Sequence, residues 1–191
     1  TILVHDGTYN ENVNVNKRLT IRSENGAAST TVQAASSNDH VFEITADYVN
    51  ISGFTATGTT VDYPNCPAGI YLSSADHCNI SENNCSNNSL GIYLRSSSNN
   101  TLTSNTATNN RYGIHLHDSS SNNTLTGNTA SNNDQGIRLV DSSSNTLTSN
   151  TANSNNDQGI ALYRSSSNTL TSNTANSNND QGIALHSSCN N

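Results

Sequence analysis

The stretch SSSNTLTSNTANSNNDQGIAL occupies residues 142–162 and occurs again, unchanged, at residues 165–185. It consists mainly of Asn, Ser and Thr, yet a perfect copy indicates that the stretch is one structural unit. Aligning the chain on the dipeptide Gly-Ile extends the series toward the amino terminus with a period of 22 or 23 residues. The repeats start at Gly69, Gly91, Gly113, Gly136, Gly159 and Gly182. The duplication is therefore the most regular part of a longer repeat.

Each unit reads Gly-Ile-x-Leu, a Ser/Asn run, Thr-Leu-Thr, Asn-Thr-Ala and a polar corner, which predicts three short strands separated by turns. Alternation places the apolar residues of each strand on one face, and stacked units align them in columns. The first-strand columns are Ile70, Ile92, Ile114, Ile137, Ile160, Ile183 and Leu72, Leu94, Leu116, Leu139, Leu162, Leu185. The second and third strands add Ile80, Leu102, Leu125, Leu147, Leu170 and Cys85, Ala107, Ala130, Ala152, Ala175.

The composition supports a stacked fold and not a conventional globule. Only 31% of the residues are hydrophobic, with no Trp and two Phe. A solenoid needs little apolar material, because each copy buries its thin core against its neighbours. We therefore predict an all-β fold, a right-handed parallel β-helix with three short strands per coil, the handedness following the bias of parallel crossovers.

The pattern predicts one β-solenoid domain over residues 1–191, with irregular coils over residues 1–68 and an inserted loop near residues 58–68. Strand-like segments of the irregular part are residues 1–4, 13–15, 19–23, 30–34, 40–44 and 48–54. Neither end carries a recognisable capping segment, so we expect each end to offer a template for further β-pairing.

Asparagines recur at one fixed place between the second and third strands. Stacked side-chain amides at such a place can hydrogen-bond along the axis and satisfy a buried corner. The predicted structural ladder is Asn83, Asn105, Asn128, Asn150 and Asn173.

Charge and hydropathy exclude several classes of partner. The formal net charge is −7 and no cluster of Lys and Arg exists, which argues against nucleic acid and anionic membranes. No apolar run approaches the roughly 20 residues of a spanning helix. No metal or other cofactor is predicted. Asn-x-Ser/Thr triplets fit an extracellular, secreted chain whose signal peptide is absent from this sequence. These glycosylation candidates are Asn50, Asn79, Asn84, Asn87, Asn99 and Asn122.

The repeat Gly-Ile-x-Leu…Asn-x-Leu…Asn-Thr-Ala resembles the right-handed parallel β-helices of the NosD-like, carbohydrate-binding and sugar-hydrolase (CASH) class. The segment DGTYNENVNVNKRLTIRS at residues 6–23 is similar to the amino-terminal coil of that class. The class includes polysaccharide lyases, periplasmic NosD proteins and methanogen cell-surface proteins, so the resemblance implies a fold and leaves the function open. The near-identical polar coils look most like the methanogen surface and sheath proteins.

The outward positions of the first strand form the face on which enzymes of this class carry their chemistry. The two columns are Tyr71, Tyr93, His115, Arg138, Ala161, Ala184 and Ser73, Arg95, His117, Val140, Tyr163, His186. Asp118 and Asp141 follow these columns on adjacent coils, and with Arg138, His115 and His117 they form the best catalytic constellation, for sugar hydrolysis or uronate elimination. The alternative, which we favour, is a set of solvated residues on a variable face. His115, His117 and Asp118 would need a further metal ligand from a neighbouring coil, so we predict no metal site.

Threonines flank the second-strand Leu residues and predict two outward Thr columns. Such arrays resemble those of solenoid ice-binding proteins, although Thr also suits any exposed strand. The columns are Thr101, Thr124, Thr146, Thr169 and Thr103, Thr126, Thr148, Thr171.

Four cysteines in an apparently extracellular chain suggest disulfides. Cys189 lies five coils beyond the other three, which at about 4.8 Å per coil is far outside the roughly 7 Å limit for a bridge. We therefore expect a local bridge between Cys66 and either Cys78 or Cys85, and a cross-link from the remaining thiol to Cys189 of a neighbouring molecule. The alternative for Cys189 is a free thiol.

Together these features predict a structural subunit of an extracellular layer (S-layer), sheath or fibre, of archaeal type, in which copies of the chain stack end to end. The alternative is a solenoid that binds or degrades polysaccharide, with cell-surface glycans as partners, through the first-strand face. An ice-binding solenoid is a third and more remote hypothesis.

Overall fold

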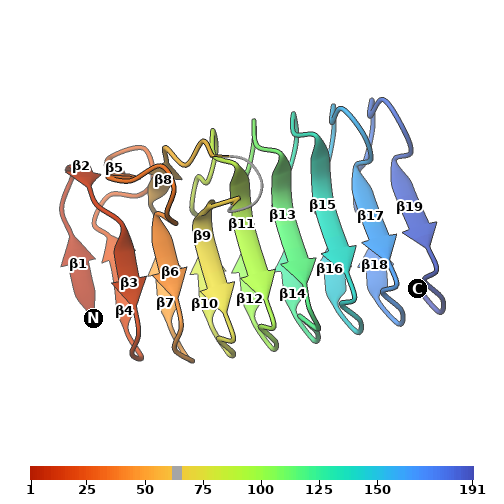
Figure 1. The fold of residues 1–191 in the computed structure, drawn as a ribbon, viewed down its shortest axis with the longest axis horizontal. Coiled ribbons are helices and arrows are strands. Elements are labelled where there is room, and N and C mark those ends of the chain that lie inside the picture. Colours follow the sequence, from red (N-terminus) through yellow and green to blue (C-terminus); the bar gives the residue numbers. More distant parts are fainter. Residues whose placement is uncertain (62–65) are drawn as a thin grey trace.

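The computed structural model describes residues 1–61 and 66–191. Every regular element in these residues is a β-strand, and all the strand pairs are parallel. Figure 1 shows the coils arranged side by side along the long axis, from the red amino-terminal end to the blue carboxy-terminal end. The predicted all-β parallel solenoid is confirmed.

Three sheets form the walls of the solenoid, and each coil contributes to each wall in turn. Sheet A contains β1 (Ile2–Val4), β4 (Thr20–Ser23), β7 (Asn50–Ser52), β10 (Asn79–Ser81), β12 (Thr101–Thr103), β14 (Thr124–Thr126), β16 (Thr146–Thr148) and β18 (Thr169–Thr171). Sheet C contains β3 (Val13–Val15), β6 (Phe42–Ile44), β9 (Ala68–Ser73), β11 (Leu90–Arg95), β13 (Tyr112–His117), β15 (Gln135–Val140), β17 (Ile160–Tyr163) and β19 (Ile183–His186).

Sheet B is the shortest wall and contains β2 (Gly7–Asn10), β5 (Thr30–Gln33) and β8 (Thr55–Thr57). Beyond β8 this wall continues as single-residue bridges that run from Thr55 through Asn84 and Thr106 to Thr174. The third predicted strand of each regular coil is thus reduced to one paired residue. β2 and β8 were not predicted, because neither short segment shows a clear apolar alternation.

The apolar columns lie inside, in the predicted register. Ile92 pairs with Ile70 and Ile114, and the buried Leu139 pairs with Leu116 and Leu162. In the last coil, which has a neighbouring coil on one side, Leu185 is 50% exposed. Burial of this core therefore depends on stacking, as the low apolar content requires.

The predicted Asn ladder is confirmed, and the structure adds two more, one at each remaining corner. Asn105 shows the pattern: its backbone N–H and Nδ2 both donate to Oδ1 of Asn128 at 3.0 Å, and Nδ2 also donates to the carbonyl of Ile80 at 2.8 Å. The added ladders are Asn88, Asn110, Asn133, Asn155, Asn178 and Asn100, Asn123, Asn145, Asn168, Asn191. Each ladder satisfies backbone groups where the chain turns.

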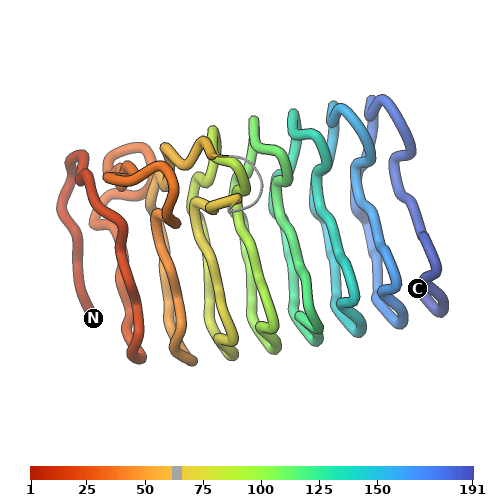
Figure 2. The backbone as a smooth tube through the Cα atoms, viewed as in Figure 1, coloured from red at the N-terminus to blue at the C-terminus, as the bar shows by residue number. Residues whose placement is uncertain are grey.

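The second ladder explains the invariant Gly before each first-strand Ile. A Cβ at Gly113 would lie 2.7 Å from Nδ2 of Asn133 and 2.7 Å from the carbonyl oxygen of Gly136. These contacts are too short for any side chain, so Gly allows the amide to pack against the strand. In Figure 2 the corners of the tube repeat from coil to coil in the regular, green to blue part of the chain.

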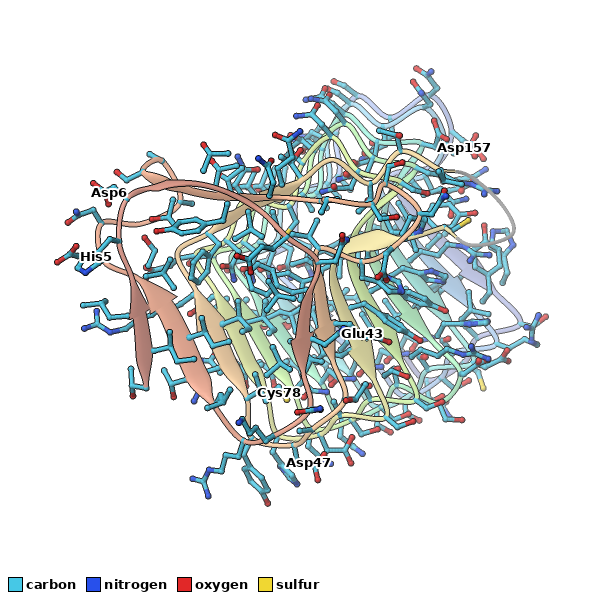
Figure 3. The ribbon with its side chains drawn as sticks, turned by 60° about the vertical axis from the view of Figure 1, so that its left-hand side comes forward. His5, Asp6, Glu43, Asp47, Cys78 and Asp157 are labelled. Atoms are coloured by element: carbon cyan, nitrogen blue, oxygen red, sulfur yellow. The ribbon has the colours of Figure 1, made fainter. Side chains whose placement is uncertain are left out.

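The predicted disulfide between Cys66 and either Cys78 or Cys85 is wrong, since all four cysteines are free thiols. Cys66 packs against the outer side of sheet C, whereas Cys85 is fully buried in the core. Cys78 lies at the corner near Asp47 (Figure 3), with its sulfur 3.5 Å from the carbonyl oxygens of Ala46 and Asp76. The three thiols therefore lie in separate environments, and Cys189 is exposed.

Part of the predicted inserted loop, residues 62–65, lies outside the described residues. The last residue of that predicted loop, Ala68, is the first residue of β9. Among the described residues no helix is long and apolar enough to cross a membrane.

Candidate ligand-binding face

Rings stack in a continuous column on the outer side of sheet C. The ring centroids of His40 and Tyr71 are 4.1 Å apart, those of Tyr71 and Tyr93 5.0 Å, and those of Tyr93 and His115 5.1 Å. The spacing follows the separation of about 4.8 Å between paired strands. On β6, Glu43 (labelled in Figure 3) is the strand neighbour of Tyr71.

The face is hollowed to a volume of about 600 Å³ beside this column. We call this depression the Tyr-Arg hollow; it is lined by His40, Cys66, Tyr71, Leu90, Tyr93, Arg95, Arg111, Tyr112, His115, His117 and Arg138. Three of these residues are arginines, and none of the described lining residues is Asp or Glu. In a chain with a net charge of −7, this grouping of arginines is local, and one of the three, Arg95, is paired with Asp118.

Arg138 and His115 form the centre of the hollow. Nη1 of Arg138 lies 3.1 Å from Nε2 of His115. Because Arg is always a donor, Nε2 accepts, and the proton of the neutral ring is on Nδ1. Burial, with the nearby Arg138 charge, holds the pKa of His115 well below its usual value, which keeps the ring neutral. Nδ1 of His115 and Nε of Arg138 are both buried donors without a partner in the described chain.

Aromatic rings fix the guanidinium of Arg138 from two sides. Its central carbon lies 4.9 Å from the ring centroid of Tyr112 and 5.1 Å from that of Tyr163. Tyr112 also meets His115 edge-on, with centroids 5.2 Å apart. The cation is therefore held in one place by cation–π contacts and one hydrogen bond.

Each carboxylate of the predicted pair is bound by an arginine. Asp118 binds Arg95, with Nε and Oδ2 2.8 Å apart, and its other oxygen lies 3.4 Å from Nδ1 of His117. Asp141 binds Arg164 on the next coil through two contacts, Nε–Oδ1 at 2.7 Å and Nη2–Oδ2 at 2.8 Å. The Arg164 hydrogen bond lowers the pKa of Asp141. Of the five predicted catalytic residues, the structure thus brings His115 together with Arg138, His117 with Asp118, and His115 with His117, whose ring centroids are 5.4 Å apart. Asp141 is bound by Arg164.

Several residues of the hollow were missed as site residues. Tyr71 and Tyr93 were visible as outward repeats, but Tyr112 precedes its repeat Gly and was not assigned to a face. His40 comes from an irregular coil; its Nδ1 accepts a hydrogen bond from the Ala68 amide at 2.9 Å, and burial lowers its pKa to about 4. Since no repeat contains His40, no periodic signal could have placed it here.

A second hollow, of about 630 Å³, lies at the neighbouring corner. Its lining is polar and includes Asn87, Ser89, Asn109 and Asp134, and it shares Arg111 with the Tyr-Arg hollow. The two depressions therefore adjoin across the edge of sheet C.

The other predicted surface features lie on different walls. The Thr columns are in register on sheet A, so that Thr101 pairs with Thr124 and Thr103 with Thr126. Ice binding by these columns stays a prediction. Four glycosylation candidates are exposed and two, Asn50 and Asn84, are half-buried. The exposed four are Asn79, Asn87, Asn99 and Asn122.

Fold and face together define a polar parallel β-solenoid with one aromatic and basic wall. The sequence profile of the family described as "Periplasmic copper-binding protein (NosD)" matches residues 10–191. The chain belongs to the NosD family. Among curated proteins, no sequence matches it.

Solved structures with the same fold include the Dettilon tailspike protein, at 13% identity and a TM-score of 0.80, covering 96% of this chain and 39% of that one. The catalytic domain of a GH87 α-1,3-glucanase in complex with nigerose matches at 18% identity and a TM-score of 0.77, covering 96% and 40%. A periplasmic alginate epimerase matches at 22% identity and a TM-score of 0.70, covering 88% and 38%. The chain thus spans about two fifths of the length of these proteins, and the likeness concerns the fold.

Proposed function

We propose that this domain is a polysaccharide-binding solenoid that acts outside the cytoplasm and holds its ligand on the outer side of sheet C. The observation that carries the proposal is the Tyr-Arg hollow, in which aromatic rings and arginines replace the Asn, Ser and Thr of the other walls. The family description as periplasmic supports the location.

A chain-like ligand suits the form of this face. The hollow spans residues of β9, β11, β13 and β15, and it adjoins a second polar depression at the corner. A polymer laid across these strands meets rings, amides and guanidinium groups in succession, which are the groups that bind sugar hydroxyls. Nigerose and alginate, in the names of two of the similar structures, are themselves carbohydrates.

Binding without catalysis is favoured by the state of the carboxylates. Asp118 and Asp141 are each engaged by an arginine, and neither lines the hollow. A general acid for glycoside cleavage needs a raised pKa, whereas that of Asp141 is lowered.

Copper, the ligand in the family's description, does not fit the groups of this face. Nε2 of His115 accepts a hydrogen bond from Arg138, and the cation beside it opposes a second positive charge. In residues 1–61 and 66–191 no three His, Cys, Asp or Glu side chains are grouped so that they could hold a metal ion. The proposal therefore involves no metal.

The test is affinity electrophoresis of the protein in gels that contain soluble plant, algal and bacterial polysaccharides. At least one polysaccharide should retard the protein, and Tyr112→Ala, which removes a ring from the hollow, should abolish the retardation. Tyr48→Ala is the matched control, because Tyr48 is a 49% exposed aromatic residue at a different corner. Equal mobility in every gel, or equal effects of the two variants, would contradict the proposal.

A second candidate function is the structural subunit of an extracellular layer, sheath or fibre. It is favoured by the three Asn ladders, which tie each coil to the next over most of the rod. Its partners would be copies of the same chain, cross-linked through the exposed Cys189. Electron microscopy of native material should show polymers that reductant shortens; monomers with and without reductant would refute this candidate.

A further inference from the structure

Arg138 is a cation without a counter-ion. The exposed arginines on either side of it along the axis, Arg95 and Arg164, each bind an Asp at 2.8 Å or less. No carboxylate pairs with Arg138 anywhere in the described part of the chain. A half-buried guanidinium loses part of its hydration. Because no anion of the described chain compensates for this loss, the positive charge of Arg138 favours the binding of an anion in the hollow.

The unused edge of Arg138 is the one best suited to a carboxylate. Nη1 is occupied by His115, which leaves Nε and Nη2, the two donors that lie parallel on one side of the guanidinium. Within residues 1–61 and 66–191, Nε has no hydrogen-bond partner. Two parallel donors at fixed spacing match the two oxygens of a carboxylate.

The chain itself shows how such an edge is filled, one coil away. In Arg164, Nε and Nη2 bind the two oxygens of Asp141 at 2.7 and 2.8 Å. The same pair of nitrogens in Arg138 forms no ion pair with a carboxylate of the described residues. The difference between the two arginines is therefore the missing carboxylate, and a ligand can supply it.

We propose that Arg138 is the specificity-determining subsite of the hollow and binds the carboxylate of a uronic acid unit in the polysaccharide. This inference rests on the polysaccharide-binding function proposed above and narrows it to acidic glycans. Tyr112 and Tyr163 hold the guanidinium in place, and their rings provide apolar surface beside the sugar ring. Nε is buried in the free protein, so binding of the ligand oxygen at this atom requires a flanking side chain to move.

His115 acts as a positioning residue in this subsite. Its neutral ring accepts from Nη1 and so turns the Nε and Nη2 edge of Arg138 away from itself. Tyr93 stacks on the ring and fixes its plane, with centroids 5.1 Å apart and planes 13° apart. A charged imidazole would repel Arg138 and release the edge from this orientation.

The experiment measures binding of three probes by isothermal titration calorimetry: oligomers of galacturonate or mannuronate, the same oligomers after reduction of their carboxyl groups, and dextran sulfate. We expect the full chain to bind a uronate oligomer and not its reduced form. Arg138→Gln should weaken binding at least about tenfold, as the loss of a charged bidentate contact predicts. Arg138→Lys, which keeps the charge without the planar fork, should lose several-fold.

Arg164→Gln is the matched control, since it removes the same charge from the next coil outside the hollow and should leave affinity unchanged. Circular dichroism of each variant verifies that it is folded. Equal losses in Arg138→Gln and Arg164→Gln, or equal affinity for the reduced oligomer, would overturn the subsite while leaving polysaccharide binding intact. Binding of dextran sulfate alone would overturn the choice of a carboxylate. Binding of none of the probes, together with no retardation by any polysaccharide, would overturn both proposals.

Discussion

Removing one amide from the middle of an Asn ladder should destabilise the solenoid more than any substitution on its outer faces. In Asn128→Ala, the buried backbone N–H of Asn105 loses its acceptor, and the carbonyl of Leu102 loses the Asn128 side-chain donor. Nδ2 of Asn105 keeps its bond to Ile80. One buried donor is thus orphaned, so we expect the free energy of unfolding to fall by about 1–3 kcal/mol.

Urea unfolding followed by far-ultraviolet circular dichroism measures this loss, and hydrogen exchange at the Asn105 amide locates it. Thr124→Ala is the control: its hydroxyl is exposed on β14 and forms no hydrogen bond in the described chain, so the change should be within about 0.5 kcal/mol. Asn128→Asp should be worse than Ala at neutral pH, because it buries a charge facing the Leu102 carbonyl, and should recover in acid, where a protonated carboxyl can donate. A loss below about 1 kcal/mol for Asn128→Ala would refute the ladder argument. So would an Asn105 amide that exchanges as slowly in Asn128→Ala as in the wild-type protein.

Three further predictions concern the core, the strand packing and the pH dependence. Leu139→Asp places a charge at a fully buried position and should abolish the β-sheet signal in circular dichroism, whereas Thr126→Asp on the outer side of sheet A should not. Gly113→Ala forces a Cβ to 2.7 Å from two neighbours and should lower the melting temperature; an unchanged melting temperature would contradict the close packing. His40 has a folded-state pKa of about 4, below its unfolded value of about 6.5, so the unfolded chain binds the proton first and stability falls as pH drops from 6.5 to 4, by up to about 3 kcal/mol. Titration of unfolding free energies should show this fall in wild type and a smaller one in His40→Asn.

The columns of the regular coils could be predicted because a strict period determines both the strand register and the side of the sheet on which each side chain lies. Leu102, Leu125 and Leu147 stand at the same place in every copy, and the structure pairs them directly. Two of the three Asn ladders escaped prediction for the opposite reason. Asn100 and Asn110 lie in corners so rich in Asn and Ser that the buried positions do not stand out from the exposed ones.

The candidate site was predictable only in part. His115 and Arg138 fall in one column, so their contact follows from the register. The pairing of Asp118 with Arg95 depends on a corner in which Asp118 has a φ of 51°. The equivalent residues Ser96, Asp141 and Arg164 share this conformation but differ in side chain, so the repeat does not predict the ion pair. The location of His40 follows from the irregular coils, whose spacing no repeat determines.

The unchanged duplication has a consequence for how such a chain can vary over time. The copy at residues 165–185 lies directly beside residues 142–162, with Leu170 paired to Leu147 and the amide of Asn150 3.0 Å from the Asn173 oxygen. Because each coil contacts only its neighbours, recombination between the two identical stretches lengthens or shortens the rod by one step of about 4.8 Å and creates no new interface. The Tyr-Arg hollow is different, since it draws on residues of five successive coils and changes only by substitution. Length and ligand specificity can therefore evolve independently in one molecule.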